Sequence, residues 1–157
     1  MAYHDDLLQQ AFQLAHNEPR KPKQASLRRA VSTAYYALFH LLISETTANW
    51  KRAHLRAELG RAFDHNTMKS ASNRLLQLPF GGEDGHAVAA LKYVAKSFSE
   101  LQENRHIADY DNTKLWTKTE ALALVGSAKR AFQAWHAIRE EQIAQGYLLS
   151  LLLKKRT

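Results

Sequence analysis

The 157-residue chain contains no cysteine, which excludes disulfide bonds, thiolate metal sites and a cysteine nucleophile. Only 3 prolines and 6 glycines interrupt it, and 45% of its residues are hydrophobic, a composition that suits long helices around a real core. Its formal net charge of +7 favours polyanionic partners, because a cationic surface attracts phosphates at long range.

The sequence shows no segment for export or for crossing a membrane. The acidic first six residues lead into no apolar signal core, and the apolar run 147–153 is far shorter than the ~20 residues of a membrane span. We therefore expect a cytoplasmic protein with no membrane partner. Its length fits a single domain over residues 1–157.

Helical periodicity dominates, and no strand-like alternation interrupts it. The first predicted helix covers 4–17 and ends before the two prolines of the loop 17–22. A long second helix covers about 23–49 and carries apolar residues at the i, i+3 and i+4 spacing of a buried stripe. This stripe consists of Leu27, Val31, Ala34, Tyr35, Leu38, Phe39 and Leu42.

The middle of the chain predicts two shorter helices over 53–78, which meet near residues 64–67. Asn66 or Thr67 is expected to cap the second of them, because a side-chain oxygen at a helix start accepts from a free backbone N–H. A loop over 78–85 follows and contains one proline and three glycines.

Two further long helices follow this loop. The first opens at Asp84 or Gly85, ends at Tyr110, and is predicted to turn inward Val88, Leu91, Val94, Ala95, Phe98 and Leu101. The last helix starts with a capping box, in which the hydroxyl of Thr117 precedes Glu120 by three residues. Its apolar stripe comprises Leu122, Val125, Phe132, Trp135 and Ile138.

The C-terminal residues 144–157 are either a helix extension or a basic tail. The leucines within 148–153 make that stretch either part of a helix or a contact in an oligomer. Together these patterns predict an all-α fold, a helical bundle of four to five main helices.

Two segments carry a family resemblance. The helix over 23–49 contains RRAVSTAYYALFHLL, and the helix before the polar turn ends in NRHIADYDN. With FDHNTMK between them, they resemble the HEPN family, whose members pair an S/T-x-x-Y-Y-A-x-F-H-type helix with a helix ending in R-x-x-A-D-Y. The match spans Leu27 to Trp135, with the helices in the family's order.

The resemblance implies a small helical bundle, often a homodimer, that acts on RNA or binds a nucleotide. Many members are metal-independent ribonucleases, including toxins encoded beside a nucleotidyltransferase-type antitoxin, and others only bind. We therefore expect a toxin–antitoxin or defence-type system with a nucleotidyltransferase-type partner protein. We expect neither a cofactor nor a metal site, since no His-Glu-x-x-His motif is present.

The catalytic motif of the family is incomplete in this chain. Catalytic members carry Arg-x(4–6)-His, and Arg105 matches the arginine. The positions where the histidine belongs hold Tyr110, Asp111 and Asn112. Metal-free cleavage of RNA needs an acid and a base that titrate near working pH, whereas tyrosine has a pKa of about 10. His40, from a neighbouring helix, and His65, from a loop, are alternative histidines.

Arg105 shares a helix face with Phe98 and Leu101 and is spaced to pair with Asp109 at i, i+4. It is therefore either a ligand of a phosphate or a buttress between helices. A variant catalytic site would consist of Arg105, His106, Asp109 and Tyr110. The candidates for binding RNA or a nucleotide are Arg105, Tyr36, His40, Arg28 and Arg29, whereas Tyr35 is expected in the core with one polar partner.

Basic residues gather at both ends of the long second helix, around 20–29 and 51–61. Each group either tracks a phosphate backbone or forms a solvated charged face. No series of aromatic residues interleaves with them, so the sequence does not indicate a platform for stacking single strands.

Three hypotheses follow. The first is a HEPN-type domain that binds RNA or a nucleotide without the standard catalytic pair. The second is a metal-independent ribonuclease with the variant site around Arg105. The third is a protein-interaction bundle that binds no nucleic acid and docks a partner or a second copy through apolar faces and residues 148–153.

Overall fold

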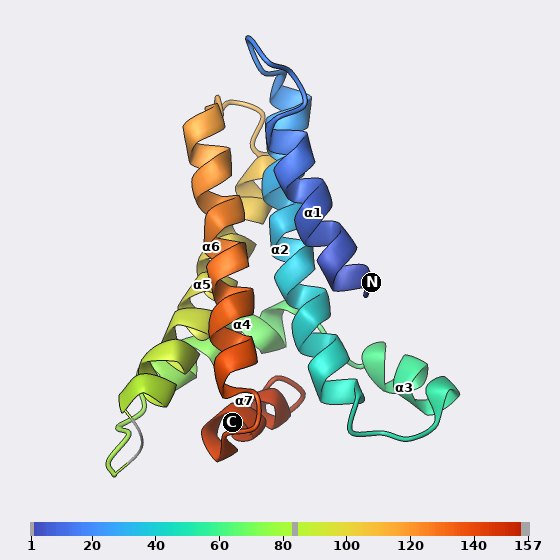
Figure 1. Ribbon diagram of the computed structural model, residues 1–157, viewed down its shortest axis with the longest axis vertical. Coiled ribbons are helices and arrows are strands. Elements are labelled where there is room, and N and C mark those ends of the chain that lie inside the picture. Colours follow the sequence, from blue (N-terminus) through green and yellow to red (C-terminus); the bar gives the residue numbers. More distant parts are fainter. Residues whose placement is uncertain (1, 83–84, 155–157) are drawn as a thin grey trace.

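The computed structural model describes residues 2–82 and 85–154, and within these ranges the chain forms helices and no strand. Helices α1 (Tyr3–Ala15), α2 (Gln24–Thr47), α5 (Gly85–Tyr110) and α6 (Lys118–Ile138) pack side by side, α4 (His65–Leu76) crosses near their lower end, and α3 (Ala53–Gly60) projects outward (Figure 1). The all-α bundle predicted from the sequence is confirmed. The last helix within these ranges is α7 (Gln142–Ser150).

Helix α2 lies at the centre of the core, because it packs against α1, α5 and α6. Every residue of its predicted stripe is buried, and so are two further alanines, Ala30 and Ala37, whose small side chains let neighbouring helices approach. The predicted inward face of α5 is buried as well, except Val88, which lies in the first turn and is only half-buried. The stripe predicted for α6 is buried too, except Leu122, which is half-buried, so periodicity identified the core correctly apart from Val88 and Leu122.

The sequence predicts N-terminal caps for two helices, and one of the two predictions is confirmed. Thr117 and Glu120 form the expected reciprocal capping box of α6. Helix α4 is capped by neither Asn66 nor Thr67 but by Asp64, whose carboxylate accepts from the backbone N–H of Thr67 at 2.8 Å. That prediction was wrong because the chain turns helical earlier, directly after the extended residue Asp64. Helix α5 begins at Gly85, and the alternative start, residue 84, lies outside the described residues.

The C-terminal segment forms a separate helix and does not extend α6. The chain turns at 139–141, and α7 then buries Tyr147 and Leu148, with Leu151 buried just after its end. Leu149 and Leu153 stay exposed, so the contact in an oligomer stays a prediction. The basic residues 155–156 lie outside the described residues. Over the described ranges, no helix is long and apolar enough to span a membrane.

Candidate functional site

Arg105 lies on the inner side of α5, and its side chain is only 11% exposed. It continues the face of Phe98 and Leu101, which are fully buried, as the spacing predicted. Its guanidinium carbon lies 5.3 Å from the ring centroid of Tyr35 and 5.8 Å from that of Tyr36. The rings of these two tyrosines on α2 therefore stabilise the cation through cation–π contacts.

The polar contacts of this guanidinium are incomplete. Asp109 is the predicted ion-pair partner, but the gap from Nη1 to Oδ2 is 3.7 Å, longer than a hydrogen bond. The Nε atom of Arg105 is buried and has no hydrogen-bond acceptor among the described residues. Leaving a buried donor without an acceptor costs roughly 1–3 kcal/mol. An anion beside Arg105 would remove that cost.

His65 joins the same cluster from α4. Its Nδ1 atom lies 2.6 Å from the hydroxyl of Tyr35. Burial raises the pKa of Tyr35 well above its usual range, so the hydroxyl keeps its proton. Burial, and then the charge of Arg105, lowers the pKa of His65, so its imidazole is neutral at pH 7. Because the hydroxyl has no other acceptor among the described residues, it donates to Nδ1 and leaves the imidazole proton on Nε2.

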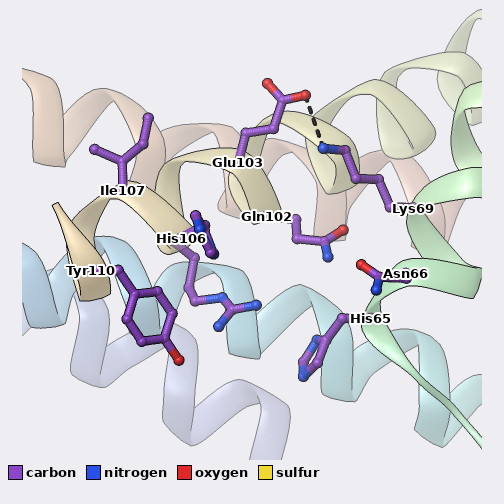
Figure 2. A pocket seen from close by; sticks show the side chains of 9 residues that line it. His65, Asn66, Lys69, Gln102, Glu103, His106, Ile107 and Tyr110 are labelled. Carbon is purple, nitrogen blue, oxygen red and sulfur yellow. Dashed lines mark ion pairs between the residues drawn. The ribbon is translucent and has the colours of Figure 1, made fainter.

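A cleft of about 740 Å³ opens between α4 and α5 over this cluster. Figure 2 shows the side chains of α4 facing those of α5 across it. Lys69 and Glu103 bridge its rim at 3.1 Å. Gln102 is only 7% exposed, and its Oε1 has no donor within the described part of the chain. The lining residues are His65, Asn66, Lys69, Gln102, Glu103, Arg105, His106, Ile107 and Tyr110.

The four residues of the predicted variant catalytic site are not all in the cleft. His106 and Tyr110 line it together with Arg105, and both are exposed, with their rings 4.9 Å apart. Asp109 does not line the cleft but lies between Arg105 and the hydroxyl of Ser32, 3.4 Å away. The aspartate therefore orients the arginine from outside the cleft.

One of the predicted binding residues contacts the arginine and a second lies beside the first, but neither of the two lines the cleft. Tyr36 contacts it directly, and His40 lies next to Tyr36 on α2 with a ring separation of 6.5 Å. Tyr3 of α1 covers His40 edge-on at 5.0 Å. Burial, followed by the charges of His4 and His65, lowers the pKa of His40, so this imidazole is also neutral at pH 7.

The other two predicted binding residues lie elsewhere. Arg28 is half-buried and closes the C-terminal end of α5, where its guanidinium donates at 2.6–2.9 Å to the backbone carbonyls of Ala108, Asp111 and Lys114. Such carbonyls have no partner within a helix, so this arginine has a structural task. Arg29 is exposed, and neither arginine lines the cleft.

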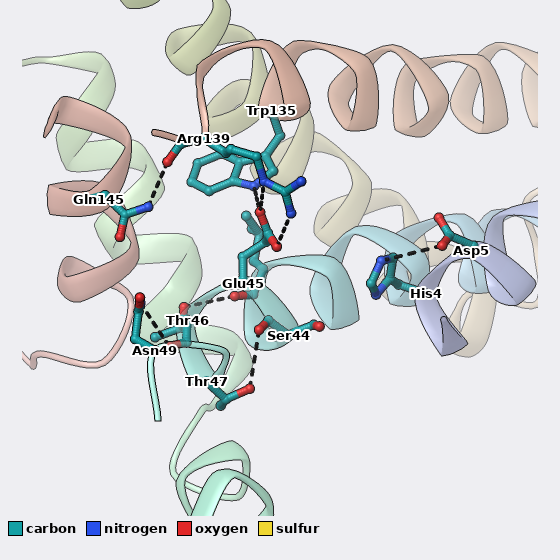
Figure 3. Close-up of polar contacts among 11 residues, drawn as sticks. His4, Asp5, Ser44, Glu45, Thr46, Thr47, Asn49, Trp135, Arg139 and Gln145 are labelled. Atoms are coloured by element: carbon teal, nitrogen blue, oxygen red, sulfur yellow. Dashed lines mark hydrogen bonds and ion pairs between the residues drawn. The ribbon is translucent and has the colours of Figure 1, made fainter. Parts of the chain in front are cut away.

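A second polar cluster joins α2 to α6 (Figure 3). The carboxylate of Glu45 accepts from Trp135 Nε1 at 2.6 Å and from Arg139 Nε at 2.8 Å. Arg139 adds a second bond to the other carboxylate oxygen, which makes the pair bidentate. Burial alone would raise the pKa of Glu45, but these hydrogen bonds lower it overall. Both carboxylate oxygens of Glu45 accept hydrogen bonds, from Trp135 and Arg139, so this cluster holds α2 and the end of α6 together.

Sequence reasoning missed part of the cleft. His65 was assigned to a loop, but it is the first residue of α4, directly after the cap Asp64. Lys69 and Gln102 were not singled out at all. Lys69 follows His65 at i, i+4, and that spacing places both on one face once the true start of α4 is known.

The fold and the site define an all-α bundle with a cationic cleft between α4 and α5. Comparison with protein-family models, with curated proteins and with solved structures found no match for this chain. No three histidine, aspartate or glutamate side chains within 2–82 and 85–154 are grouped to hold a metal ion.

Proposed function

We propose that the chain is a HEPN-type domain whose α4–α5 cleft binds a phosphate group of RNA or of a nucleotide. The observation that carries the proposal is the buried Arg105, whose Nε has no acceptor among the described residues and whose carboxylate partner lies beyond hydrogen-bond distance. Arginine presents a planar fork of donors that matches phosphate oxygens. Proteins that break a packing rule in this way usually do so at functional sites.

The surroundings of Arg105 suit an anion. His65 offers its Nε2–H, and Lys69 adds a second cation at the rim. Glu103 offsets part of that charge through its ion pair with Lys69. The exposed ring of Tyr110 is available to stack on a base. These groups bind a phosphate without a metal ion.

Binding without standard cleavage follows from the same geometry. The family's histidine is absent from positions 110–112. The Nδ1 atom of His65 is occupied by Tyr35, and its Nε2 carries a proton, so this imidazole is a donor and not a base in the free protein.

A metal-independent ribonuclease is the second candidate, and one observation favours it. An arginine and two histidines, His65 and His106, line a single cleft, which is the inventory that acid–base cleavage of RNA requires. In that case the imidazole proton of His65 would lie on Nδ1 and be donated to the Tyr35 hydroxyl oxygen, which would leave Nε2 free to take the proton of a bound 2′-hydroxyl.

The test is to incubate the protein with labelled total RNA in EDTA, beside Arg105→Ala. Lys129→Ala is the matched control, because it removes one exposed positive charge on α6 outside the cleft. We expect RNA retention without cleavage, weakened as salt rises from about 50 to 200 mM, lost in Arg105→Ala and kept in Lys129→Ala. Cleavage that disappears in Arg105→Ala would favour the ribonuclease. Neither retention nor cleavage would favour a protein-interaction bundle.

The proposal also includes a cytoplasmic homodimer working beside a nucleotidyltransferase-type partner in a toxin–antitoxin or defence-type system. The two HEPN-like segments support it, and so do Leu149 and Leu153, which are exposed at the C-terminal end. Light scattering after gel filtration tests the dimer. A mass near 17.9 kDa at micromolar concentration would contradict that part of the proposal.

A further inference from the structure

Residues 48–62, here called the α3 arm, project from the end of α2 (Figure 1). Helix α3 contributes no buried residue and packs mainly against α2, where Gly60 lies close to the side chain of Ile43. The arm carries four exposed or half-exposed basic residues and one carboxylate, namely Lys51, Arg52, Arg56, Arg61 and Glu58. The α3 arm is therefore a basic projection whose helix contributes no residue to the buried core.

One large aromatic side chain stands at the base of this arm. Trp50 is 52% exposed, whereas the other two tryptophans, Trp116 and Trp135, are 3% and 0% exposed. An indole exposed among charged residues leaves much apolar surface in contact with water. This exposure is unfavourable unless a partner covers the surface.

The backbone holds Trp50 in a fixed position. Its N–H donates to the carbonyl of Thr47 at 2.9 Å. The guanidinium of Arg56 donates to the carbonyls of Trp50 and Lys51 at 2.9 and 2.8 Å. A shallow hollow of about 360 Å³ surrounds the indole and is lined by Asn49, Trp50, Lys51, Arg52 and Leu55.

We propose that the α3 arm is a second nucleic-acid contact, at which an unpaired base stacks on Trp50 while Lys51 and Arg52 hold the flanking phosphates. Every base has a π-face, so one exposed indole on an anchored backbone, beside two cations, binds single strands without sequence preference. This site shares no lining residue with the α4–α5 cleft and goes beyond the function proposed there. The arm leads directly into the cleft along the chain, since His65 follows Arg61 by four residues.

The pattern fits a base better than a lipid surface. Insertion into a membrane interface requires a continuous apolar face. Leu55 and Leu59 are half-buried, and α3 packs mainly against α2. Trp50 is then the one large apolar side chain of the arm that is mostly exposed, and charged residues follow it directly.

Tryptophan fluorescence tests the proposal directly, because the other two indoles are buried. The whole protein is titrated with a short single-stranded oligoadenylate, with inorganic polyphosphate, and with vesicles of anionic lipid. We expect the oligoadenylate to quench the emission, polyphosphate to leave it nearly unchanged, and the vesicles to cause no blue shift. Trp50→Phe should abolish the quenching.

Affinity measurements on variants complete the test. Trp50→Leu should weaken oligoadenylate binding by roughly 5- to 100-fold, the usual contribution of one stacked base, and Trp50→Phe should restore most of it. Both changes lie on an exposed side chain, so an unaltered circular dichroism spectrum is the folding control. Equal quenching by polyphosphate, a blue shift with vesicles, or unchanged affinity in Trp50→Leu would each overturn the proposal. Arg105→Ala tests the cleft separately: retention of total RNA at low protein concentration requires both contacts and is lost, whereas oligoadenylate at higher concentration still quenches Trp50.

Discussion

Two arginines of the bundle, Arg139 and Arg105, differ in how completely their guanidinium groups are hydrogen-bonded. Arg139, the C-cap residue of α6, binds Glu45 through two of its nitrogens, and Trp135 completes the carboxylate's partners (Figure 3). Arg105 of α5 has a carboxylate at 3.7 Å and a buried Nε with no acceptor among the described residues. Arg139 is also the more exposed of the two, so burial does not explain the difference.

The contrast separates a structural cluster, around Glu45, from a candidate binding site, around Arg105. A charged group with all its partners in place holds helices together, and removing one partner leaves the others unsatisfied. A charged group that folding leaves incomplete contributes little to stability, and its missing acceptor is what a ligand supplies. The comparison therefore predicts opposite responses of the two clusters to substitution.

The largest effect on stability is expected from Glu45→Ala. This change leaves Trp135 Nε1 and Arg139 without their acceptor, which should lower the free energy of unfolding by about 2 kcal/mol after allowance for the partial exposure of Arg139. Urea denaturation measures it, with the exposed neighbour Glu140→Ala as control. RNA retention should not change. Equal stability of Glu45→Ala and Glu140→Ala would show that the Glu45 cluster does not stabilise the fold.

A smaller effect is expected from Tyr35→Phe, which removes the hydroxyl that bonds His65. The loss should be about 1 kcal/mol of stability and a severalfold weakening of RNA retention, because the imidazole is then no longer oriented. Tyr93→Phe is the matched control, since its hydroxyl accepts from Arg130 on the surface. If both variants retain RNA equally well, the His65 tautomer plays no part in binding.

Stability should also fall as the pH drops below about 6.5. Burial lowers the pKa of His40 and of His65 in the folded protein, so the unfolded chain takes up protons first and is favoured as the pH falls. The Glu45 cluster stays ionised through this window, because its pKa is also lowered. Denaturation at pH 7.5 and 5.5 checks the sign.

Two histidine variants test which group causes this loss of stability. His65→Asn should reduce the acid loss, whereas His54→Asn on the exposed side of α3 should leave it unchanged. An identical loss in both variants would place the titrating group outside the cleft.

The helices and the core were predictable because one physical signal determines both. Apolar spacing of 3.6 residues sets which face of α2, α5 and α6 is buried, and Thr117 with Glu120 marks a start without reference to the rest of the fold. The burial of Arg105 and its pairing with Asp109 followed from the same spacing.

The rest depends on contacts between distant segments. Arg28 closes the end of α5 from 80 residues away, so its sequence neighbours cannot reveal that task. The position of His65 depends on where α3 ends and Asp64 turns the chain. The exposure of Trp50 depends on how the α3 arm leaves α2. Local patterns do not encode the first and the last of these, whereas the cap at Asp64 is a local signal that the choice of Asn66 or Thr67 passed over.

The comparison is tested most directly by replacing each arginine with methionine, which keeps the packing of the stem and removes the charge. The account predicts that Arg105→Met loses at most about 1 kcal/mol of unfolding free energy, because its Nε has no acceptor among the described residues and the contacts given up are mainly those with the rings of Tyr35 and Tyr36, and that it no longer retains RNA. Arg139→Met should lose about 2 kcal/mol and retain RNA normally. A strongly destabilised Arg105→Met, or one that still retains RNA, would contradict the central claim.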